Sequence, residues 1–285
     1  GADPSGTTDT AQYNVAVGAD ALDAITTGDY NTAIGQIALT ALTTGGGNTA
    51  VGRSSLSAVT TGGGNVGFGQ NTLSAVTTAD DNVAIGTAAG ISITSGARNV
   101  AVGRASMAAA VTGVDNVAVG ANILTALTSG NDNIMMGRYS GDAITTGDDN
   151  IGIGYGSVSK VTTASDNIGI GRSTLAENTT GYSNVAIGYD AGKQITTGYK
   201  NVIIGDSSGG QSVDPQTGWE NIIIGWNSGY NLTSGNANVL IGVGSGYSLN
   251  NDENNIMIGY QSGYYHTGGP NTFVGRYAGR GTTGT

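Results

Sequence analysis

The sequence predicts an all-β protein, a parallel β-roll or β-solenoid with 16 rungs of mostly 17 residues. The first observation is a five-residue segment that recurs 16 times, with Asn first, three mostly apolar residues next and Gly last, as in residues 14–18. The second is its spacing, which is 17 residues from Asn14 to Asn201 and then 20, 17, 17 and 16 residues. A fixed period of this kind is typical of solenoids, and it is too short for the helical repeats of roughly 33–47 residues.

Composition is the third observation. Gly accounts for 51 of the 285 residues, whereas Phe and Trp number only 2 each. A chain with so few large aromatic side chains cannot fill one thick globular core. It can fill a thin core that is repeated from rung to rung, because stacked neighbours share the hydrophobic stabilisation that a single rung lacks.

Each rung begins with a predicted short strand, whose positions we number from the Asn as zero. Positions +1 and +3 are nearly all Val or Ile, position +2 is Ala or Gly in ten of the first eleven copies, and position +4 is always Gly. Alternate residues of a strand share a face. We therefore expect positions +1 and +3 to point into the core, and positions +2 and +4 to form a flat outward face. A second apolar segment ending in Thr-Thr-Gly, as in residues 21–28, predicts a second short strand and a turn.

The predicted flat face favours a homotrimer, in which three copies bury it along a common axis; a monomeric roll is the alternative. The predicted oligomer face consists of Ala16, Ala33, Ala50, Ala84, Ala101 and Ala118. The repeated Asn is expected to form a ladder of side-chain amides, since stacked identical Asn residues pair in this way. The residues chosen to represent this structural ladder are Asn14, Gly18, Asn31, Gly35, Asn116, Gly120, Asn201 and Gly205.

The chain divides into four predicted segments. Residues 1–13 are a lead-in or cap, and residues 14–200 are the regular 17-residue repeats. Residues 201–220 form an irregular rung with an inserted loop, and residues 221–285 are aromatic-rich repeats. In the late rungs Gly replaces Leu at position +8 while position +2 becomes larger, so the cross-section is expected to stay constant. The enlarged residues are Ile203, Ile223, Leu240, Met257 and Phe273.

Three segments of the sequence resemble a known family: Asn-Thr-Ala-Ile-Gly at residues 31–35, Ile-Gly-Tyr-Gln-Ser-Gly-Tyr at 258–264 and Asn-Thr-Phe-Val-Gly-Arg-Tyr-Ala-Gly at 271–279. They are similar to the repeats of phage tail-fibre shafts and related bacterial surface proteins. They also resemble the shorter repeats in the heads of trimeric autotransporter adhesins, which form β-rolls packed as trimers. The resemblance covers about residues 14–279. It implies a fibre of the virion tail, located outside the cell, that spaces and presents a tip for contact with the host.

The alternative is an adhesin of the bacterial cell surface or a subunit of an extracellular filament. Members of the resembling family often carry a self-cleaving chaperone domain at the C-terminus, and no segment here is similar to one. The chain begins with Gly, does not start as a signal peptide and ends partway through a rung, so we expect a fragment of a longer protein.

Composition also narrows the classes of function. The net charge is −10, and the 10 Lys and Arg residues form no run, so a nucleic-acid partner is not expected. No stretch approaches the ~20 apolar residues of a membrane span, so membrane insertion is not expected. The one histidine, His266, has no acid or nucleophile at a fixed offset. We therefore expect a non-enzymatic protein without an organic cofactor.

An acidic column occupies position +16, immediately before the next Asn. Its members are Asp81, Asp115, Asp132, Asp149 and Asp166, and Arg98 interrupts them. Oxygen ligands suit Ca²⁺, so calcium bound between rungs is one hypothesis. The other is that solvent and neighbouring backbone amides offset the repulsion.

Aromatic residues suggest a binding surface. Tyr230, Tyr247 and Tyr264 stand one rung apart at position +9, Trp226 lies at position +5, and Trp219 flanks the inserted loop. Exposed aromatic rings stack on sugars, which would suit a host cell-surface glycan as partner; a host cell-surface protein is the other partner expected. Alternatively, stacked tyrosines shield the edge of a narrow roll. Thr-Thr pairs near the end of each rung raise ice binding as a minor alternative.

Overall fold

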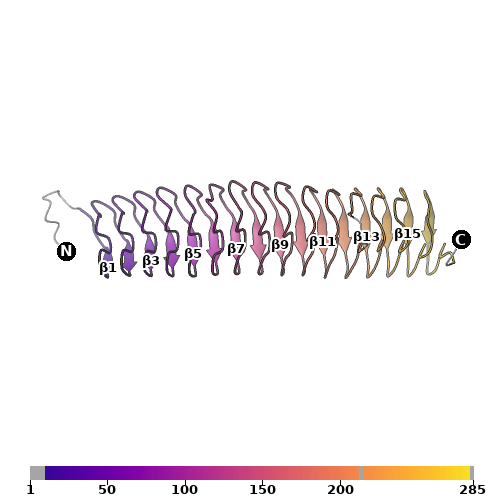
Figure 1. Cartoon of the computed structure of the whole chain (residues 1–285), viewed down its shortest axis with the longest axis horizontal. Helices are drawn as coiled ribbons and strands as arrows, with labels where there is room; N and C mark the ends of the chain where they lie inside the picture. Colours follow the sequence, from indigo (N-terminus) through magenta and orange to yellow (C-terminus); the bar gives the residue numbers. More distant parts are fainter. Residues whose placement is uncertain (1–9, 212–214, 283–285) are drawn as a thin grey trace. The chain divides into compact units, whose positions relative to one another are not determined.

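The computed structural model describes residues 10–211 and 215–282, which fall into two units divided between Asn133 and Ile134. Both are all-β and built as parallel β-solenoids, as the repeat predicts (Figure 1). The strands of the first unit are β1 Val15–Val17, β2 Thr32–Ile34, β3 Thr49–Val51, β4 Val66–Phe68, β5 Val83–Ile85, β6 Val100–Val102 and β7 Val117–Val119. Those of the second are β8 Ile134–Met136, β9 Ile151–Ile153, β10 Ile168–Ile170, β11 Val185–Ile187, β12 Val202–Ile204, β13 Ile222–Ile224, β14 Val239–Ile241, β15 Ile256–Ile258 and β16 Thr272–Val274.

Within each unit, consecutive strands pair in parallel and in register, so that equivalent positions lie side by side. Ala33 pairs with Ala50 in the first unit, and Gly152 pairs with Gly169 in the second. The 20-residue interval leaves this register intact, because Val202 still pairs with Ile222. The strand pairing of this rung is therefore unaffected by the additional residues; residues 212–214 of the predicted inserted loop lie outside the described part of the chain.

The structure reverses the predicted faces of the strand. Ala33, Ala50, Ala84, Ala101 and Ala118 are 0% exposed inside the roll, whereas the residues at +1 and +3 are half-buried or exposed. Only Ala16, on the first rung, is exposed. The six alanines are therefore not an oligomer face, because they belong to an interior column. The physical reason is the narrow interior, in which a small residue at +2 leaves room for the leucine at +8 of the same rung.

Two interior columns exchange volume along the chain. Early rungs combine Ala or Gly at +2 with a buried Leu at +8, such as Leu39 or Leu73. In the late rungs the larger residue is at +2: a β-carbon placed on Gly209 would lie 2.8 Å from Cδ1 of Ile203. The same side-chain volume thus enters the interior from opposite walls, and the thickness of the roll is maintained.

The repeated Asn residues form a buried hydrogen-bonded ladder. Asn48 donates its backbone N–H and its Nδ2 to Oδ1 of Asn31, at 2.9 and 3.1 Å, and Nδ2 also donates to the carbonyl oxygen of Gly62 at 2.9 Å. The same bonds join Asn14 to Asn31, Asn99 to Asn116 and Asn184 to Asn201. Each Asn therefore connects successive rungs and also closes its own rung, because the carbonyl that it contacts lies 14 residues further on.

The Gly at position +4 ends each strand at a position where no side chain fits. Gly35 has φ of 139°, and a β-carbon there would lie 2.5 Å from the carbonyl oxygen of Gly52 on the next rung. Gly18, Gly120 and Gly205 have similar positive φ values of 129°, 140° and 137°. These glycines allow the chain to turn out of the strand while the backbones of successive rungs remain in contact.

Candidate interaction surfaces

The outer face of the strands is apolar, because it carries the Val and Ile residues of positions +1 and +3. In the first unit Ile34 is 40% and Ile85 is 42% exposed, and in the second Ile153 is 37% and Ile222 is 40% exposed. Single exposed apolar residues are ordinary, but a contiguous apolar patch marks an interaction site. Because the strands pair in register, these residues form two columns on each unit, which we call the Val/Ile face.

This face is not predicted from the sequence, because both sides of the strand are apolar and the larger Val and Ile side chains at +1 and +3 are the ones expected to be buried. A signal was nevertheless present in the sequence. From the rung of Asn201 onward the residue at +2 is large and the residue at +8 is Gly, and two columns can exchange volume only if they share one interior. The position that varies together with the core is therefore the inward one.

Charges of opposite sign lie at the two ends of the strand. Position +5 carries five of the ten basic residues, Arg53, Arg104, Arg138, Arg172 and Arg276. The position before the Asn, here called −1, carries the predicted acidic column Asp81, Asp115, Asp132, Asp149 and Asp166. All of these arginines and acids are exposed except Asp115, which is half-buried. The Val/Ile face is thus bounded by an acidic column at one end and by arginines at the other.

The acidic column forms no described metal site. Among residues 10–211 and 215–282, no three His, Asp or Glu side chains are grouped as metal ligands would be. Asp115 instead accepts hydrogen bonds from Nε and Nη2 of Arg98, both at 2.7 Å. The hydrogen bond from Arg98 lowers the pKa of Asp115. Asp80, one residue before Asp81, accepts a hydrogen bond from the backbone N–H of Gly63 at 2.7 Å. Contacts of this kind with backbone amides offset the repulsion between carboxylates without a metal. Calcium binding stays a prediction.

The tyrosines at +9 stack on one another. Tyr230 and Tyr247 have ring centroids 4.9 Å apart, and Tyr247 and Tyr264 are 4.6 Å apart, with nearly parallel planes. Both faces of the central ring are therefore covered, and burial raises the pKa of Tyr247 and of Tyr264. Because a sugar stacks on the face of a ring, this arrangement favours the shielding interpretation for the +9 column.

The tryptophans lie in different surroundings. Trp219 stacks on Tyr199 with centroids 5.8 Å apart, and Tyr199 stacks on Tyr182 at 4.9 Å, a second aromatic column that sequence reasoning did not identify. Trp226 is 57% exposed, and no stacked aromatic ring covers it within the described residues. Of the five residues proposed for glycan contact, Trp226 has the most accessible ring.

Arginine and tyrosine alternate at position +5 in the second unit, in the order Arg138, Tyr155, Arg172 and Tyr189. The guanidinium carbon of Arg172 lies 5.7 Å from the ring centre of Tyr155 and 5.8 Å from that of Tyr189. Cation–π contacts of this type stabilise an exposed cation by about 0.5–1 kcal/mol. They hold the arginine at the end of the strand without a carboxylate partner.

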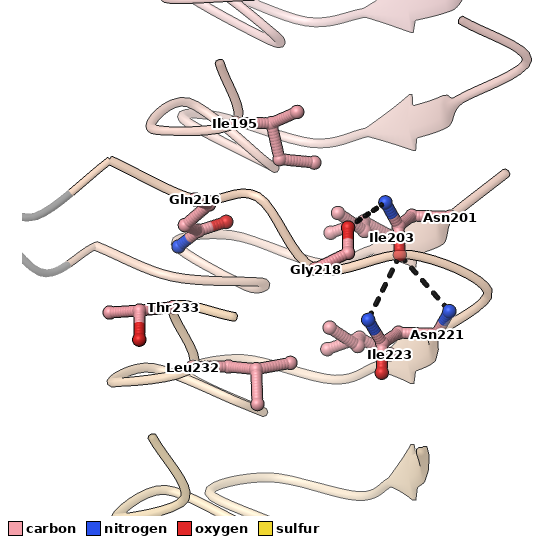
Figure 2. Close-up of a pocket in the computed structure, with 9 residues that line it drawn as sticks. All are labelled: Ile195, Asn201, Ile203, Gln216, Gly218, Asn221, Ile223, Leu232 and Thr233. Atoms are coloured by element: carbon pink, nitrogen blue, oxygen red, sulfur yellow. Dashed lines mark hydrogen bonds between the residues drawn. The ribbon is translucent and has the colours of Figure 1, made fainter. Parts of the chain in front are cut away.

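A small cavity lies inside the second unit, at the irregular rung. Figure 2 shows that the Asn ladder passes along it, with Nδ2 of Asn201 donating to the Gly218 carbonyl at 2.9 Å and Asn221 donating to Oδ1 of Asn201. Nε2 of Gln216 is buried and has no hydrogen-bond partner among the described residues. The residues that line the cavity are Ile195, Asn201, Ile203, Gln216, Gly218, Asn221, Ile223, Leu232 and Thr233. The cavity is a packing defect next to the insertion rather than a binding site.

The two members of a Thr-Thr pair lie in different surroundings. The hydroxyl of the first member donates to the backbone carbonyl of the next rung, as in Thr43 to Thr60 at 3.0 Å. The second member, such as Thr44 or Thr61, is exposed.

His266 is half-buried and lies edge-on to Phe273, with ring centres 4.9 Å apart.

Comparison with protein-family models, with curated proteins and with solved structures gives no match. Over the described ranges, the chain contains no helix with the length and apolar character that a membrane crossing requires.

Proposed function

We propose that this chain is a structural, non-enzymatic fibre protein of a phage tail, which spaces and presents a receptor-binding tip and assembles as a homotrimer. The observation that carries the proposal is the Val/Ile face. It recurs on successive rungs of each unit and exposes large apolar side chains such as Phe68 and Ile85, at 56% and 42%. A protein that acts alone in water gains nothing from such a surface, whereas copies of one chain bury it by repeating one contact on every rung.

The proposed trimer therefore uses the face opposite to the one that the sequence favoured. Burial of one exposed Ile or Val side chain contributes about 1.5–3 kcal/mol when it is complete. The contributions add over the rungs of each unit, so even partial burial exceeds the cost of association, which is on the order of 4–15 kcal/mol. Three copies around one axis can bury both the +1 and the +3 column of each chain.

Support for the host-contact part of the proposal is local. Trp226 lies in the aromatic-rich segment and presents an exposed ring, and Trp219 lies in the irregular rung that precedes this segment. We propose a host-surface glycan as the ligand of this segment. A glycan array probed with wild-type protein and with Trp226→Ala tests it: signal that is lost in the variant supports the site. Signal that persists, or no signal with wild-type protein, contradicts it.

The location is tested by immunogold electron microscopy with antibodies against this chain. Label along the tails of phage particles is the expected result. Label on the envelope of uninfected bacteria would instead favour the cell-surface adhesin, and label on detached filaments would favour the extracellular filament.

A further inference from the structure

We propose that the second unit carries a binding site for a linear acidic polysaccharide in which charged sugars alternate with neutral ones. The site is the row of position +5 residues Arg138, Tyr155, Arg172 and Tyr189, which we call the Arg/Tyr row. It is separate from the Trp226 site proposed above, and it gives the arginines at the end of the strand a ligand of opposite charge.

The Arg/Tyr row is accessible and regularly spaced. All four of its side chains are exposed, with Tyr155 at 50% and Tyr189 at 47%. Each follows the glycine that ends its strand, as Arg172 follows Gly171, so the row lies beside the Val/Ile face rather than on it. Because the strands of these four rungs pair in register, successive members of the row stand about 4.8 Å apart.

The two arginines of the row have no carboxylate partner. Arg172 lies between the rings of Tyr155 and Tyr189, and Arg138 lies over the ring of Tyr139, 4.5 Å from its centre. Cation–π contacts restrict a guanidinium but leave its charge in place, so both arginines can form bidentate hydrogen bonds with a carboxylate from another molecule. The ion pairs within residues 10–211 and 215–282 involve other cations, namely Arg98, Lys160, Lys193 and Lys200.

The spacing of the arginines indicates which sugars carry the charge. Arg138 and Arg172 are two rungs apart, or about 10 Å along the row. One disaccharide of an extended polysaccharide covers a similar length. A carboxylate on every second sugar would therefore meet an arginine on every second rung. The neutral sugar between them would lie at Tyr155, whose hydroxyl can both donate and accept hydrogen bonds.

The neighbouring rungs limit the length of the site. Position +5 is Ala121 on the rung before the row and Asp206 on the rung after it. Asp206 is exposed and would repel an acidic ligand. The buried Asp190, at +6 on the last rung of the row, does not oppose binding in this way, because Nζ of Lys193 lies 3.1 Å from its Oδ2. The site thus covers four rungs, which corresponds to about two disaccharides by the same spacing.

A polysaccharide fits the row better than a nucleic acid, which is also a linear polyanion. Bases bind proteins by stacking on free aromatic faces, whereas the Tyr155 ring already contacts Arg172 and lies edge-on to Tyr139, with ring centres 5.8 Å apart. A nucleic acid also carries a phosphate at every nucleotide, and two cations over four rungs do not match that density. Sugar hydroxyls, in contrast, can bond to the tyrosine hydroxyls.

The test is the binding of the full chain to oligosaccharides of hyaluronan and of heparosan, measured by isothermal titration calorimetry. In both polymers glucuronate alternates with neutral N-acetylglucosamine, but the linkages differ. We expect at least one of them to bind, and its binding to be lost when the carboxylates are reduced to alcohols. Binding of neither acidic form, or equal binding of the reduced form, would overturn the proposal.

A pair of double variants locates the binding. Arg138→Gln/Arg172→Gln should raise the dissociation constant about tenfold or more, because hydrogen bonds to charged groups are the stronger ones. Arg53→Gln/Arg104→Gln is the matched control, since it removes the same charge from exposed +5 positions in the first unit, where no tyrosine stands at +5 on an adjacent rung. Equal weakening by both variants would show a general attraction to positive charge and would overturn the site.

Further variants separate this site from the rest of the molecule. Tyr155→Phe, which removes only a hydroxyl, should weaken binding several-fold without changing the assembly mass in light scattering; unchanged affinity would overturn the role of the tyrosine. Trp226→Ala should leave the affinity unchanged, and a loss as large as that of Arg138→Gln/Arg172→Gln would assign the ligand to the tryptophan site instead. Competition by single-stranded DNA would overturn the assignment to a polysaccharide.

Discussion

The side chain of Met257 occupies the space in which a β-carbon on Gly263 would lie, since such a carbon would be 2.2 Å from Sδ of the methionine. The two residues stand at +2 and +8 of one rung. Other rungs reverse the arrangement, with Ala33 at +2 and Leu39 at +8, both fully buried. This relationship shows that the central residue of each strand faces inward and that the Val/Ile face is the outer one.

Exchanging the volumes of these two positions should therefore be tolerated better than changing either one. We expect Gly263→Leu to lower the free energy of unfolding by about 1–3 kcal/mol through overpacking. Met257→Ala should lower it by about 2–5 kcal/mol by leaving a cavity. The double variant should lose clearly less than the sum, because it recreates the early type of rung. Urea denaturation measures all three, and additive losses would show that the columns do not share one interior.

The Asn ladder should be the most sensitive polar feature of the interior. Asn116→Ala removes the bonds to Oδ1 of Asn99 and to the Gly130 carbonyl and leaves the Asn133 N–H without its acceptor. Each orphaned buried group costs about 1–3 kcal/mol, so we expect a loss of about 3 kcal/mol or more in thermal or urea unfolding. Gln36→Ala, which removes an exposed carboxamide, is the control. Equal effects of the two substitutions would contradict the role of the ladder.

Calcium is tested by melting the protein with EDTA and with added Ca²⁺. We expect the same melting temperature in both, because the acids at −1 stand one to a rung and Asp115 already has a cationic partner. A melting temperature that rises when Ca²⁺ is added to the wild type, but not when it is added to Asp149→Asn/Asp166→Asn, would contradict this expectation and establish the calcium hypothesis.

The Arg98–Asp115 pair sets a small pH dependence whose sign follows from the pKa. The pKa of Asp115 is lower in the folded chain than its ordinary value, chiefly through the hydrogen bond from Arg98. The stabilisation is therefore present above the unfolded pKa of about 3.9 and is lost as the pH falls through the folded value. Asp115→Asn should melt slightly below wild type at neutral pH and together with it in acid. A gap that widens in acid would contradict the assignment.

The repeat made the fold predictable because its period, its glycines and its Asn column each constrain the backbone in the same way on every rung. The prediction failed at the faces of the strand, where residues such as Val100 and Ala101 are both apolar and only packing decides which one is buried. The candidate surfaces were harder still to predict. The stack of Tyr182, Tyr199 and Trp219 joins residues separated by one regular and one irregular interval, so the spacing alone did not align them.

The most direct test of the account is the mass of the assembly in solution for one pair of double variants. Ile85→Arg/Ile153→Arg places a charge on the Val/Ile face of each unit, and Thr61→Arg/Thr146→Arg places the same charges on exposed positions away from it. We expect light scattering to give three times the 28.2 kDa chain mass for wild type and for the threonine variant. The isoleucine variant should have a lower mass with an unchanged far-ultraviolet circular dichroism spectrum. A trimer that survives both isoleucine substitutions would contradict the claim that this face joins the copies.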